Sequence, residues 1–341
     1  MLNPITVIVD RDIPFISGVL EPYAAVRYLV GSEIHPSDLH DASALLVRSR
    51  THCDEALLED SPVEFIGTAT VGTDHIDFDF CDERGIETAS APGCNAGGVV
   101  QHFFTALYAI ASRKGISLKD KTLGVIGVGH VGSRVADLGE RLGFRVLRND
   151  PPREALEKPE PGYFCGLQQL LQESDIVTIH IPLEYNLNYA GASFFGAMKE
   201  GALFFNASRG EVVVEEALLK ARNRLGAICL DVWRNEPDIN LELLAAADIA
   251  TPHIAGYSEQ GKINGTMAVV RAFGRHFGIE PLRDFTIPTT VRPLDFEGKS
   301  QEQICEMLLN RYDIWKDDAA LRAAPADFEA QRAAYDYRVE F

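Results

Sequence analysis

An arginine, a glutamate and a histidine in the second half of the chain have side chains suited to acid–base chemistry on a carboxylic acid. Arg209 and Glu236 each follow a short apolar run, and His253 lies in the segment Thr-Pro-His-Ile-Ala-Gly-Tyr. A guanidinium can bind a carboxylate through two hydrogen bonds and polarise an adjacent carbonyl. An imidazole can take the proton of a hydroxyl group, and a neighbouring carboxylate can hold its tautomer. Together these residue types indicate proton transfer at a hydroxy acid.

Each of the three residues also has an explanation without chemistry. Arg209 precedes a glycine and could be a surface arginine in a turn. His253 could cap a turn or fill the core, and Glu236, which precedes a proline, could be a solvated turn residue. The three positions are therefore hypotheses that depend on the motifs around them.

A glycine-rich segment predicts a dinucleotide site. Residues 127–132 read Gly-Val-Gly-His-Val-Gly, after an apolar run at 123–126 and before a helical pattern at 133–142. The first glycine permits a tight turn, the second lets the backbone approach a pyrophosphate, and the third lets helix and strand pack closely. An isolated triplet can also be only a tight turn. The predicted cofactor contacts at the helix N-terminus are Gly127, Gly129, Val131 and Gly132.

The acidic residue Asp150 indicates which dinucleotide is preferred. It ends the segment 145–150, about 20 residues after the first glycine, where such folds place a ribose-binding carboxylate. A carboxylate there accepts hydrogen bonds from ribose hydroxyls and repels a 2′-phosphate, so NAD is predicted. Arg148 and Arg153 flank this acid and could attract a 2′-phosphate, which keeps NADP as the alternative.

The elements that must position these residues alternate between short apolar runs and helical patterns, which is typical of parallel sheets covered by helices. We predict an α/β protein with two doubly wound sheets. The first has helices at 14–20 and 54–58 and strands at 6–9, 44–47 and 65–67. The second has strands at 123–127, 145–147, 176–180, 202–206 and 227–230.

A glycine-rich break at 92–98, followed by a long apolar helix at about 99–112, suggests a domain boundary. We predict a discontinuous substrate-binding domain of residues 1–94 and 256–285, and a nucleotide-binding domain of residues 95–255. Residues 286–341 form a C-terminal segment with helices expected at 301–316 and 326–337. A segment of this size has little room for its own core, so it should pack on the body or on a partner subunit.

Composition narrows the classes of partner. The 341 residues carry 50 Asp+Glu against 32 Lys+Arg, a net charge of −18, which repels nucleic acid and anionic membranes. The apolar run 103–111 is far shorter than the roughly 20 residues that span a bilayer. The six cysteines show no metal-ligand spacing, so we expect reduced thiols and no metal. The N-terminus lacks a signal-peptide pattern, so we expect a cytoplasmic protein.

Four motifs in this order resemble the D-isomer-specific 2-hydroxyacid dehydrogenases: GVGHVG, NASRGEVV, LDVWRNEP and TPHIAGYS. The resemblance implies a Rossmann NAD-binding domain and a flavodoxin-like substrate domain. It also implies that Arg209 binds and polarises the substrate carboxylate, Glu236 supports the histidine, and His253 accepts the proton. The further NAD contacts that it implies are Asp150, Ala207, Ser208, Arg209, Asp231 and Gly256, and the substrate contacts are Ser49, Thr70 and Tyr257.

Further motifs resemble one branch of that family, which oxidises 4-phospho-D-erythronate at C2 in vitamin B6 synthesis. They are LLVRSRT, GTATVGTDHID, APGCNAGGVVQ and NDPPR, and the tail motifs RPLDF and YDIWKDDAALR imply a homodimer. The substrate phosphate needs cations, for which Arg48 and Arg50 are the candidates. Ile181 stands where relatives often have threonine, so one hydroxyl contact to NAD should be missing. The tail ends at Phe341, earlier than in that branch, so we expect a smaller dimerisation element.

Two alternatives to this function remain. The first is a dehydrogenase for another D-2-hydroxy acid, such as 3-phosphoglycerate or glycerate, because a single pocket arginine decides among these substrates. The second is a protein that senses NAD(H) without turnover, since co-repressors also use this fold. Substrate profiling distinguishes the first alternative from oxidation of 4-phospho-D-erythronate. Negligible turnover of every acid would favour the second.

Overall fold

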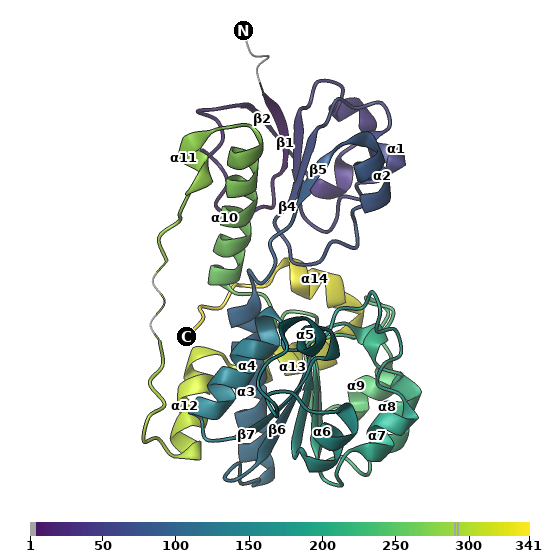
Figure 1. The fold of residues 1–341 in the computed structure, drawn as a ribbon, viewed down its shortest axis with the longest axis vertical. Coiled ribbons are helices and arrows are strands. Elements are labelled where there is room, and N and C mark those ends of the chain that lie inside the picture. The colour runs from purple at the N-terminus through teal and green to yellow at the C-terminus, as the bar shows by residue number, and fades with distance from the viewer. Residues whose placement is uncertain (1–4, 290, 292) are drawn as a thin grey trace. The chain divides into compact units, whose positions relative to one another are not determined.

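The computed structural model describes residues 5–289, 291 and 293–341. The chain forms two compact units, one made of Met1–Asn95 with Ser258–Val291 and the other of Ala96–Tyr257 with Arg292–Phe341. Each unit is a parallel sheet with helices on both faces (Figure 1). This confirms the predicted α/β class with two doubly wound sheets.

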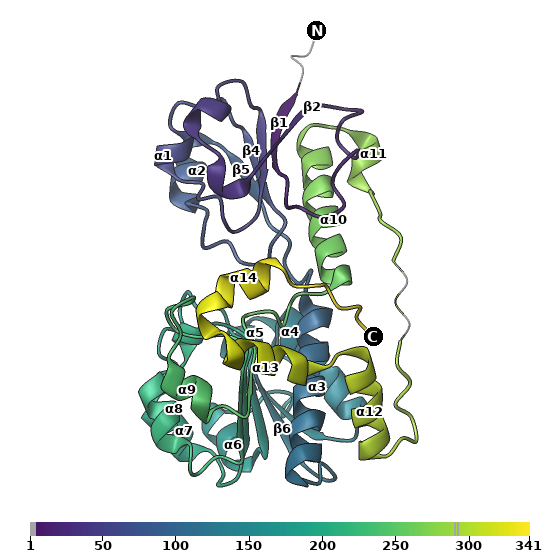
Figure 2. The ribbon, with the colours of Figure 1, turned by 180° about the vertical axis from the view of Figure 1, so that it is seen from behind.

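The first unit has a five-stranded sheet in the order β2-β1-β3-β4-β5, which is the flavodoxin-like order. Its strands are β1 (Thr6–Asp10), β2 (Ala25–Leu29), β3 (Ala44–Val47), β4 (Phe65–Thr68) and β5 (Glu87–Ala89). The short helices α1 (Glu55–Leu58) and α2 (Phe78–Arg84) cover one face, and α10 (Glu259–His276) and α11 (Glu280–Arg283) cover the other (Figures 1 and 2). Two 3-10 turns, η1 (Gly31–Glu33) and η2 (Pro36–Asp38), connect β2 to β3.

Helix α10 attaches the second segment of this unit through its apolar face. Phe273 is fully buried, and its ring meets that of Phe65 on β4 edge to face, with the centroids 6.2 Å apart. Burying one such side chain contributes about 1.5–3 kcal/mol. The chain therefore returns to the first sheet after completing the second.

The helix predicted at 14–20 is wrong, because this segment consists of turns. Phe15 and Gly18 have φ angles of 61° and 82°, values in the left-handed region that a right-handed helix excludes. Strands β2 and β5 were not predicted. β2 is a half-exposed edge strand and β5 has only three residues, so neither has the buried apolar run that marked the other strands.

The second unit has a six-stranded sheet in the order β11-β10-β9-β8-β6-β7. Its strands are β6 (Thr122–Ile126), β7 (Arg145–Asn149), β8 (Ile176–Ile179), β9 (Leu203–Asn206), β10 (Ala227–Leu230) and β11 (Ile249–Ala250). The order reverses at β6, which lies between β7 and β8. In open α/β sheets, ligands bind at the carboxyl ends of the strands around such a reversal.

Helices cover both faces of this second sheet, and the long apolar helix α3 (Ala96–Lys114) is almost entirely buried. With α3, the helix α4 (His130–Arg141) packs on one face (Figure 1). The others in the body of the unit are α5 (Pro151–Glu157), α6 (Leu167–Glu173), α7 (Ala192–Ala197), α8 (Glu215–Ala221) and α9 (Leu241–Ala246), with the 3-10 turn η3 (Gly210–Val212).

The C-terminal segment packs on this second unit. It comprises α12 (Gln301–Arg311), α13 (Ile314–Ala323), the 3-10 turn η4 (Pro325–Asp327) and α14 (Phe328–Ala333). Buried Ile304 and Leu308 of α12 join the core formed by α3 (Figure 2). The single helix predicted at 301–316 is wrong. Tyr312 is extended, with φ −147°, and the side chain of Asp313 caps a new helix by accepting from the N–H of Trp315.

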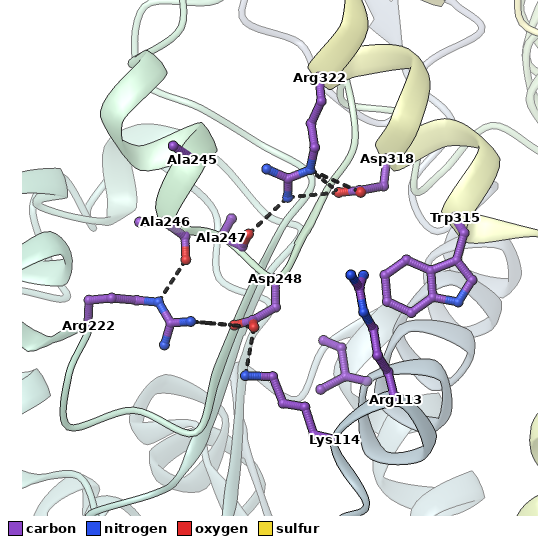
Figure 3. Close-up of a pocket in the computed structure, with 11 residues that line it drawn as sticks. Arg113, Lys114, Arg222, Ala245, Ala246, Ala247, Asp248, Trp315, Asp318 and Arg322 are labelled. Carbon is purple, nitrogen blue, oxygen red and sulfur yellow. Dashed lines mark hydrogen bonds and ion pairs between the residues drawn. The ribbon is translucent and has the colours of Figure 1, made fainter.

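An arginine on α13 ties the tail to the amino end of β11. Arg322 binds both oxygens of Asp318 and donates to the carbonyl oxygen of Ala247 (Figure 3). It also donates to the carbonyl oxygen of Leu244. Asp318 in turn accepts from the N–H of Ala250 on β11 at 2.8 Å. A cavity of about 450 Å³ beside the contact between Arg322 and Asp318 is lined by further cationic side chains. Two of them, Lys114 and Arg222, form ion pairs with Asp248.

Candidate active site

Arg209, Glu236 and His253 lie in the loops that follow β9, β10 and β11. These three strands are neighbours in the second sheet and run parallel, so their carboxyl ends share one edge. That edge is where open α/β sheets bind their ligands. The structure therefore places all three predicted residues at the same edge of one unit.

His253 is hydrogen-bonded to Glu236, with 2.7 Å between Nδ1 and Oε2. The other carboxylate oxygen accepts from the backbone N–H of Trp233 at 2.9 Å, which fixes the carboxylate. A neutral imidazole whose Nδ1–H donates to a carboxylate has Nε2 as its acceptor nitrogen. Nε2 of His253 is thus the atom suited to take a proton.

The backbone at His253 adopts a left-handed conformation, with φ 55°. For a non-glycine residue this conformation costs of order 1–3 kcal/mol, so the surroundings must hold it in place. The N–H of His253 donates to the carbonyl of Asp231 at 2.7 Å. The Trp233 indole, itself buried, donates to the carbonyl of Thr251 at 3.0 Å.

Asp231 organises the loop on both sides of His253. Its buried carboxylate accepts from the Thr251 hydroxyl at 2.6 Å and from the N–H groups of Ile254 and Ala255 at 2.8 and 2.9 Å. The sequence predicts a cofactor contact for Asp231; in the structure, its carboxylate follows β10 and binds the loop that follows β11. This structural function has no local signal, because its partners lie about 20 residues further along the chain.

Arg209 leaves β9 in a loop held by Asn206. The amide of Asn206 donates to the carbonyl of Arg209 at 2.9 Å, and its oxygen accepts the Ser208 N–H and hydroxyl at 3.0 and 2.8 Å. The guanidinium also bonds the Ser208 carbonyl at 2.9 Å. A Cβ on the next residue, Gly210, would lie 2.0 Å from the carbonyl carbon of Trp233. The glycine thus lets the arginine loop pack directly on the loop that carries Glu236.

The glycine loop between β6 and α4 has the geometry expected of a pyrophosphate cradle. Gly127 has φ 80°, and a Cβ on Gly132 would lie 1.9 Å from the Gly127 carbonyl oxygen, so neither can carry a side chain without distortion. A Cβ on Gly129 would meet nothing within 4 Å. Gly129 therefore faces open space at the start of α4, where backbone N–H groups can receive an anion. Val131 lies in the first turn of that helix.

Asp150 caps α5 and reaches back to the glycine loop. Its carboxylate accepts from the N–H of Val128 at 2.7 Å and of Arg153 at 3.1 Å. A carboxylate has about four acceptor positions, so it can still bind ribose hydroxyls. Arg153 bonds Glu157 at 2.5 Å, and Arg148 bonds Glu140 at 2.9 Å. Both arginines are already paired with carboxylates, which weakens the argument for a 2′-phosphate, and the residues at this edge fit NAD.

Ile181, which stands where relatives often have threonine, lies beside the glycine loop. Its Cγ2 would lie 2.7 Å from a Cβ on Gly127, so its side chain packs against the first glycine of the loop. The preceding His180 is bonded to the Thr178 hydroxyl at 3.0 Å, and burial lowers its pKa to about 3. His180 is therefore neutral and contributes no cation to this part of the site.

Four of the predicted substrate residues lie in the first unit. Ser49 and Arg50 are exposed after β3, and Arg48 donates to the carbonyl of Asp12 at 3.0 Å. Thr70 follows β4 and is bonded to the Thr68 hydroxyl at 2.7 Å. These residues gather at the carboxyl edge of their own sheet. The fifth, Tyr257, belongs to the second unit.

Sequence reasoning missed two buried residues beside these substrate candidates. Asp10, at the carboxyl end of β1, is 1% exposed, and burial raises the pKa of its carboxyl group. His75 bonds the Thr68 hydroxyl at 3.1 Å, and burial lowers the pKa of its imidazole. His75 lies within the motif GTATVGTDHID but was not singled out, and Asp10 ends an apolar strand without any motif of its own.

The remaining predicted contacts line the same edge of the second sheet. Ala207 and Ser208 follow β9, and Gly256 follows the loop of His253; all three are partly exposed. Among the residues that the structure describes, no group of three or more acidic, histidine or cysteine side chains is placed to hold a metal ion. No helix within the described part of the chain is both long and apolar enough to cross a membrane.

The chain is similar to several known proteins. Residues 105–255 match the family described as D-isomer specific 2-hydroxyacid dehydrogenase, NAD binding domain. The erythronate-4-phosphate dehydrogenase of Bacteroides fragilis is 42% identical over 342 residues, which cover 98% of this chain and 97% of that protein.

Solved structures of two dehydrogenases have the same fold. D-lactate dehydrogenase from Aquifex aeolicus, complexed with NAD and lactic acid, has a TM-score of 0.66 and 27% identity, and the match covers 84% of this chain and 100% of that one. NAD-bound 3-phosphoglycerate dehydrogenase from Entamoeba histolytica has a TM-score of 0.68 and 25% identity, over 84% of this chain and 100% of that one.

Proposed function

Because the chain belongs to the D-isomer-specific 2-hydroxyacid dehydrogenase family, and is thus an NAD-dependent oxidoreductase, we propose that it oxidises 4-phospho-D-erythronate. The product is (R)-3-hydroxy-2-oxo-4-phosphobutanoate, an intermediate of pyridoxal 5′-phosphate synthesis. The observation that carries this proposal is the similarity to erythronate-4-phosphate dehydrogenases over nearly the whole chain, with 42% identity to the Bacteroides fragilis protein. The pair of His253 and Glu236 supplies the chemistry that such an oxidation needs.

In the proposed mechanism, each residue of the second unit has one task. Arg209 binds the C1 carboxylate and stabilises negative charge that develops on the C2 oxygen. Nε2 of His253 takes the proton of the C2 hydroxyl, and the imidazolium that forms is stabilised by Glu236, 2.7 Å from Nδ1. NAD, when bound, accepts two electrons and one hydrogen from C2. Gly129 and Asp150 would hold this cofactor at the pyrophosphate and the ribose.

Charge at the ribose site is expected to set the cofactor preference. Asp150→Ser keeps a side chain that can cap α5 but removes the negative charge that repels a 2′-phosphate. The ratio of kcat/KM for NAD to that for NADP should fall about tenfold or more. The exposed Glu154 in the first turn of α5 is the matched control, because Glu154→Ser also removes one charge. An equal fall in both variants would place the ribose elsewhere.

Arg50 is expected to bind the substrate phosphate. It is exposed after β3, and Arg50→Ala should raise KM for 4-phospho-D-erythronate about tenfold while changing KM for unphosphorylated D-erythronate little. Arg275→Ala is the control, because Arg275 is also exposed and lies at the far end of α10. An unchanged KM for the phosphorylated acid would move the phosphate site to Arg48 or another cation.

The proposal also covers the assembly and the compartment. A homodimer is inferred from the tail motifs that resemble the dimerisation segment of relatives. A cytoplasmic location fits six free thiols, which persist in a reducing compartment. Sedimentation of the purified protein tests the first statement, and fractionation of the source cells tests the second.

The substrate is tested by following NADH formation with three acids in parallel: 4-phospho-D-erythronate, 3-phosphoglycerate and D-glycerate. The assay is repeated with an added 2-oxo acid that reoxidises tightly held NADH, since slow cofactor release can hide turnover. Preferential turnover of the erythronate supports the proposal. Turnover of only another acid replaces the substrate, and no turnover at all favours a sensor of NAD(H).

A further inference from the structure

Near the end of the chain, the side chain of Arg338 is buried in the second unit. It is 8% exposed, and its guanidinium lies over the ring of Tyr312, 4.4 Å from the centroid. Within the described part of the chain, no carboxylate forms an ion pair with it. A buried charge without an ionic partner is costly unless polar groups satisfy all its donors.

Backbone carbonyls supply most of those acceptors, and three of them belong to the loop that follows His253. Nη1 donates to the carbonyls of Ile254 and Tyr257 at 2.9 and 3.1 Å, and Nη2 donates to the carbonyl of Ala255. The remaining donors reach the first turns of α3, at the Gly98 carbonyl (3.0 Å) and the Gln101 side chain (3.1 Å). The guanidinium thus joins the loop to a buried helix.

Two buried opposite charges contact neighbouring peptide groups and share the one that joins Ile254 to Ala255. Asp231 accepts from the N–H groups of Ile254 and Ala255, whereas Arg338 donates to the carbonyls of the same two residues. The two charges polarise the shared peptide group in a mutually favourable sense. Removing either charge leaves the other one buried without the opposite charge that helps to offset its cost of burial. His253 directly precedes these peptides, so their position sets the direction of its side chain.

Aromatic residues of the tail also surround Tyr257. Its ring centroid lies 6.0 Å from that of Tyr335 and 6.2 Å from that of Tyr337. The Tyr335 hydroxyl donates to Asp317 on α13 at 3.0 Å and accepts from Arg338 at 3.2 Å. Gln101 fixes the next residue by donating to the carbonyl of Val339 at 3.0 Å. The tail is therefore held at several points around the loop.

We infer that Arg338 is a positioning residue for the oxidation, which it supports by holding the 254–257 backbone so that His253 faces Glu236 and Tyr257 keeps its place. This inference rests on the proposed function. It assigns the C-terminal tail a contribution to catalysis in addition to any contribution to assembly.

A second tail arginine provides the matched control. Arg322 also binds backbone carbonyls, those of Leu244 and Ala247, but these precede β11, whereas the loop of His253 follows it. Figure 3 shows the bond to Ala247. Arg338→Met and Arg322→Met each remove one guanidinium from the tail. Both should lower the Tm, whereas only the first should change the catalytic loop.

The test compares kcat, KM for NAD and Tm in the two variants. Arg338→Met should lower kcat about 10- to 100-fold, as expected for a proton acceptor displaced by a fraction of an ångström to one ångström. KM for NAD should rise less than kcat falls, because Gly256 is only one of the predicted NAD contacts. Arg322→Met should keep kcat at the wild-type value. Wild-type kcat in Arg338→Met, or an equal loss in both variants, would overturn the inference.

Two further measurements keep the inference testable. The first applies if Arg338→Met does not fold, and the second applies if the protein does not oxidise 4-phospho-D-erythronate. If Arg338→Met does not fold, Arg338→Lys, which keeps the positive charge, and Arg338→Ala take its place. Added ethylguanidinium should occupy the space left in Arg338→Ala and restore part of the lost kcat. If it restores none, Arg338 does not act by positioning the loop. The downfield proton signal of His253 Nδ1–H needs no substrate: it should shift in the Arg338 variants and not in Arg322→Met. An unchanged signal rejects the inference even where the proposed function fails.

Discussion

Replacing His253 with asparagine is expected to lower kcat for hydroxy-acid oxidation by about 10²- to 10⁴-fold. The reason is geometric: Nδ1 is committed to Glu236 at 2.7 Å, which leaves Nε2 as the acceptor for the C2 hydroxyl proton. Asparagine keeps a side chain that can bond the glutamate but has no group that accepts a proton at neutral pH. The measurement is steady-state NADH formation at saturating acid and NAD.

A matched histidine in the first unit controls for this change. His276 makes the same kind of contact, with Nδ1 2.7 Å from Oε2 of Glu87, but on the far end of α10. His276→Asn should leave kcat unchanged, and binding of NADH, followed by its fluorescence, should be similar in both variants. A His253→Asn enzyme with near-normal kcat would exclude His253 as the acceptor. Activity that returns only at high pH would point to solvent as the base.

Replacing Arg209 with lysine is expected to lower kcat/KM for the acid about 10²- to 10³-fold. An ammonium group keeps the charge but cannot bind a carboxylate through two parallel hydrogen bonds while polarising the adjacent oxygen. The loop itself should persist, because Asn206 holds it through the backbone of Arg209 and Gly210 packs on Trp233. The loss should therefore appear in kinetics and not in Tm.

Arg224 is the control for the arginine variant. It donates to the carbonyls of Gly196 and Met198 and lies before β10, at the amino end of the sheet. Arg224→Lys should change kcat/KM by less than about twofold, as expected for a group outside the site. If Arg209→Lys were equally active, the substrate carboxylate would have to be bound by another cation.

The buried strands and the glycine loop were predictable because their signals are local. Strands such as β6 and β9 are continuous apolar runs. Of the three glycines in residues 127–132, Gly127 is required by its positive φ and Gly132 by a close backbone contact, whereas Gly129 leaves open space at the start of α4. Edge strands were harder. β11 has only two residues, and it exists because β10 pairs with it and Asp318 of α13 bonds its backbone. Neither partner is visible in the segment itself.

In the candidate site, too, some residues were predictable from local signals and others were not. The proximity of His253 and Glu236 was expected from residue types at successive strand ends, and the structure places them 2.7 Å apart. The contacts of Arg338 were not predicted, because its partners at Ile254 and Gly98 lie 84 and 240 residues away and are backbone carbonyls with no residue preference. Sequence patterns identify groups that do chemistry better than groups that hold a loop in place.

The fate of the hydrogen on C2 decides whether the protein oxidises this acid by hydride transfer to NAD. 4-Phospho-D-erythronate deuterated at C2 is incubated with the protein and NAD, and the reduced cofactor and the product acid are analysed by mass spectrometry. We expect the deuterium in the reduced nicotinamide, with one equivalent of the 2-oxo acid formed. Reduced cofactor without deuterium, or no reduction of NAD by this acid, would contradict this expectation.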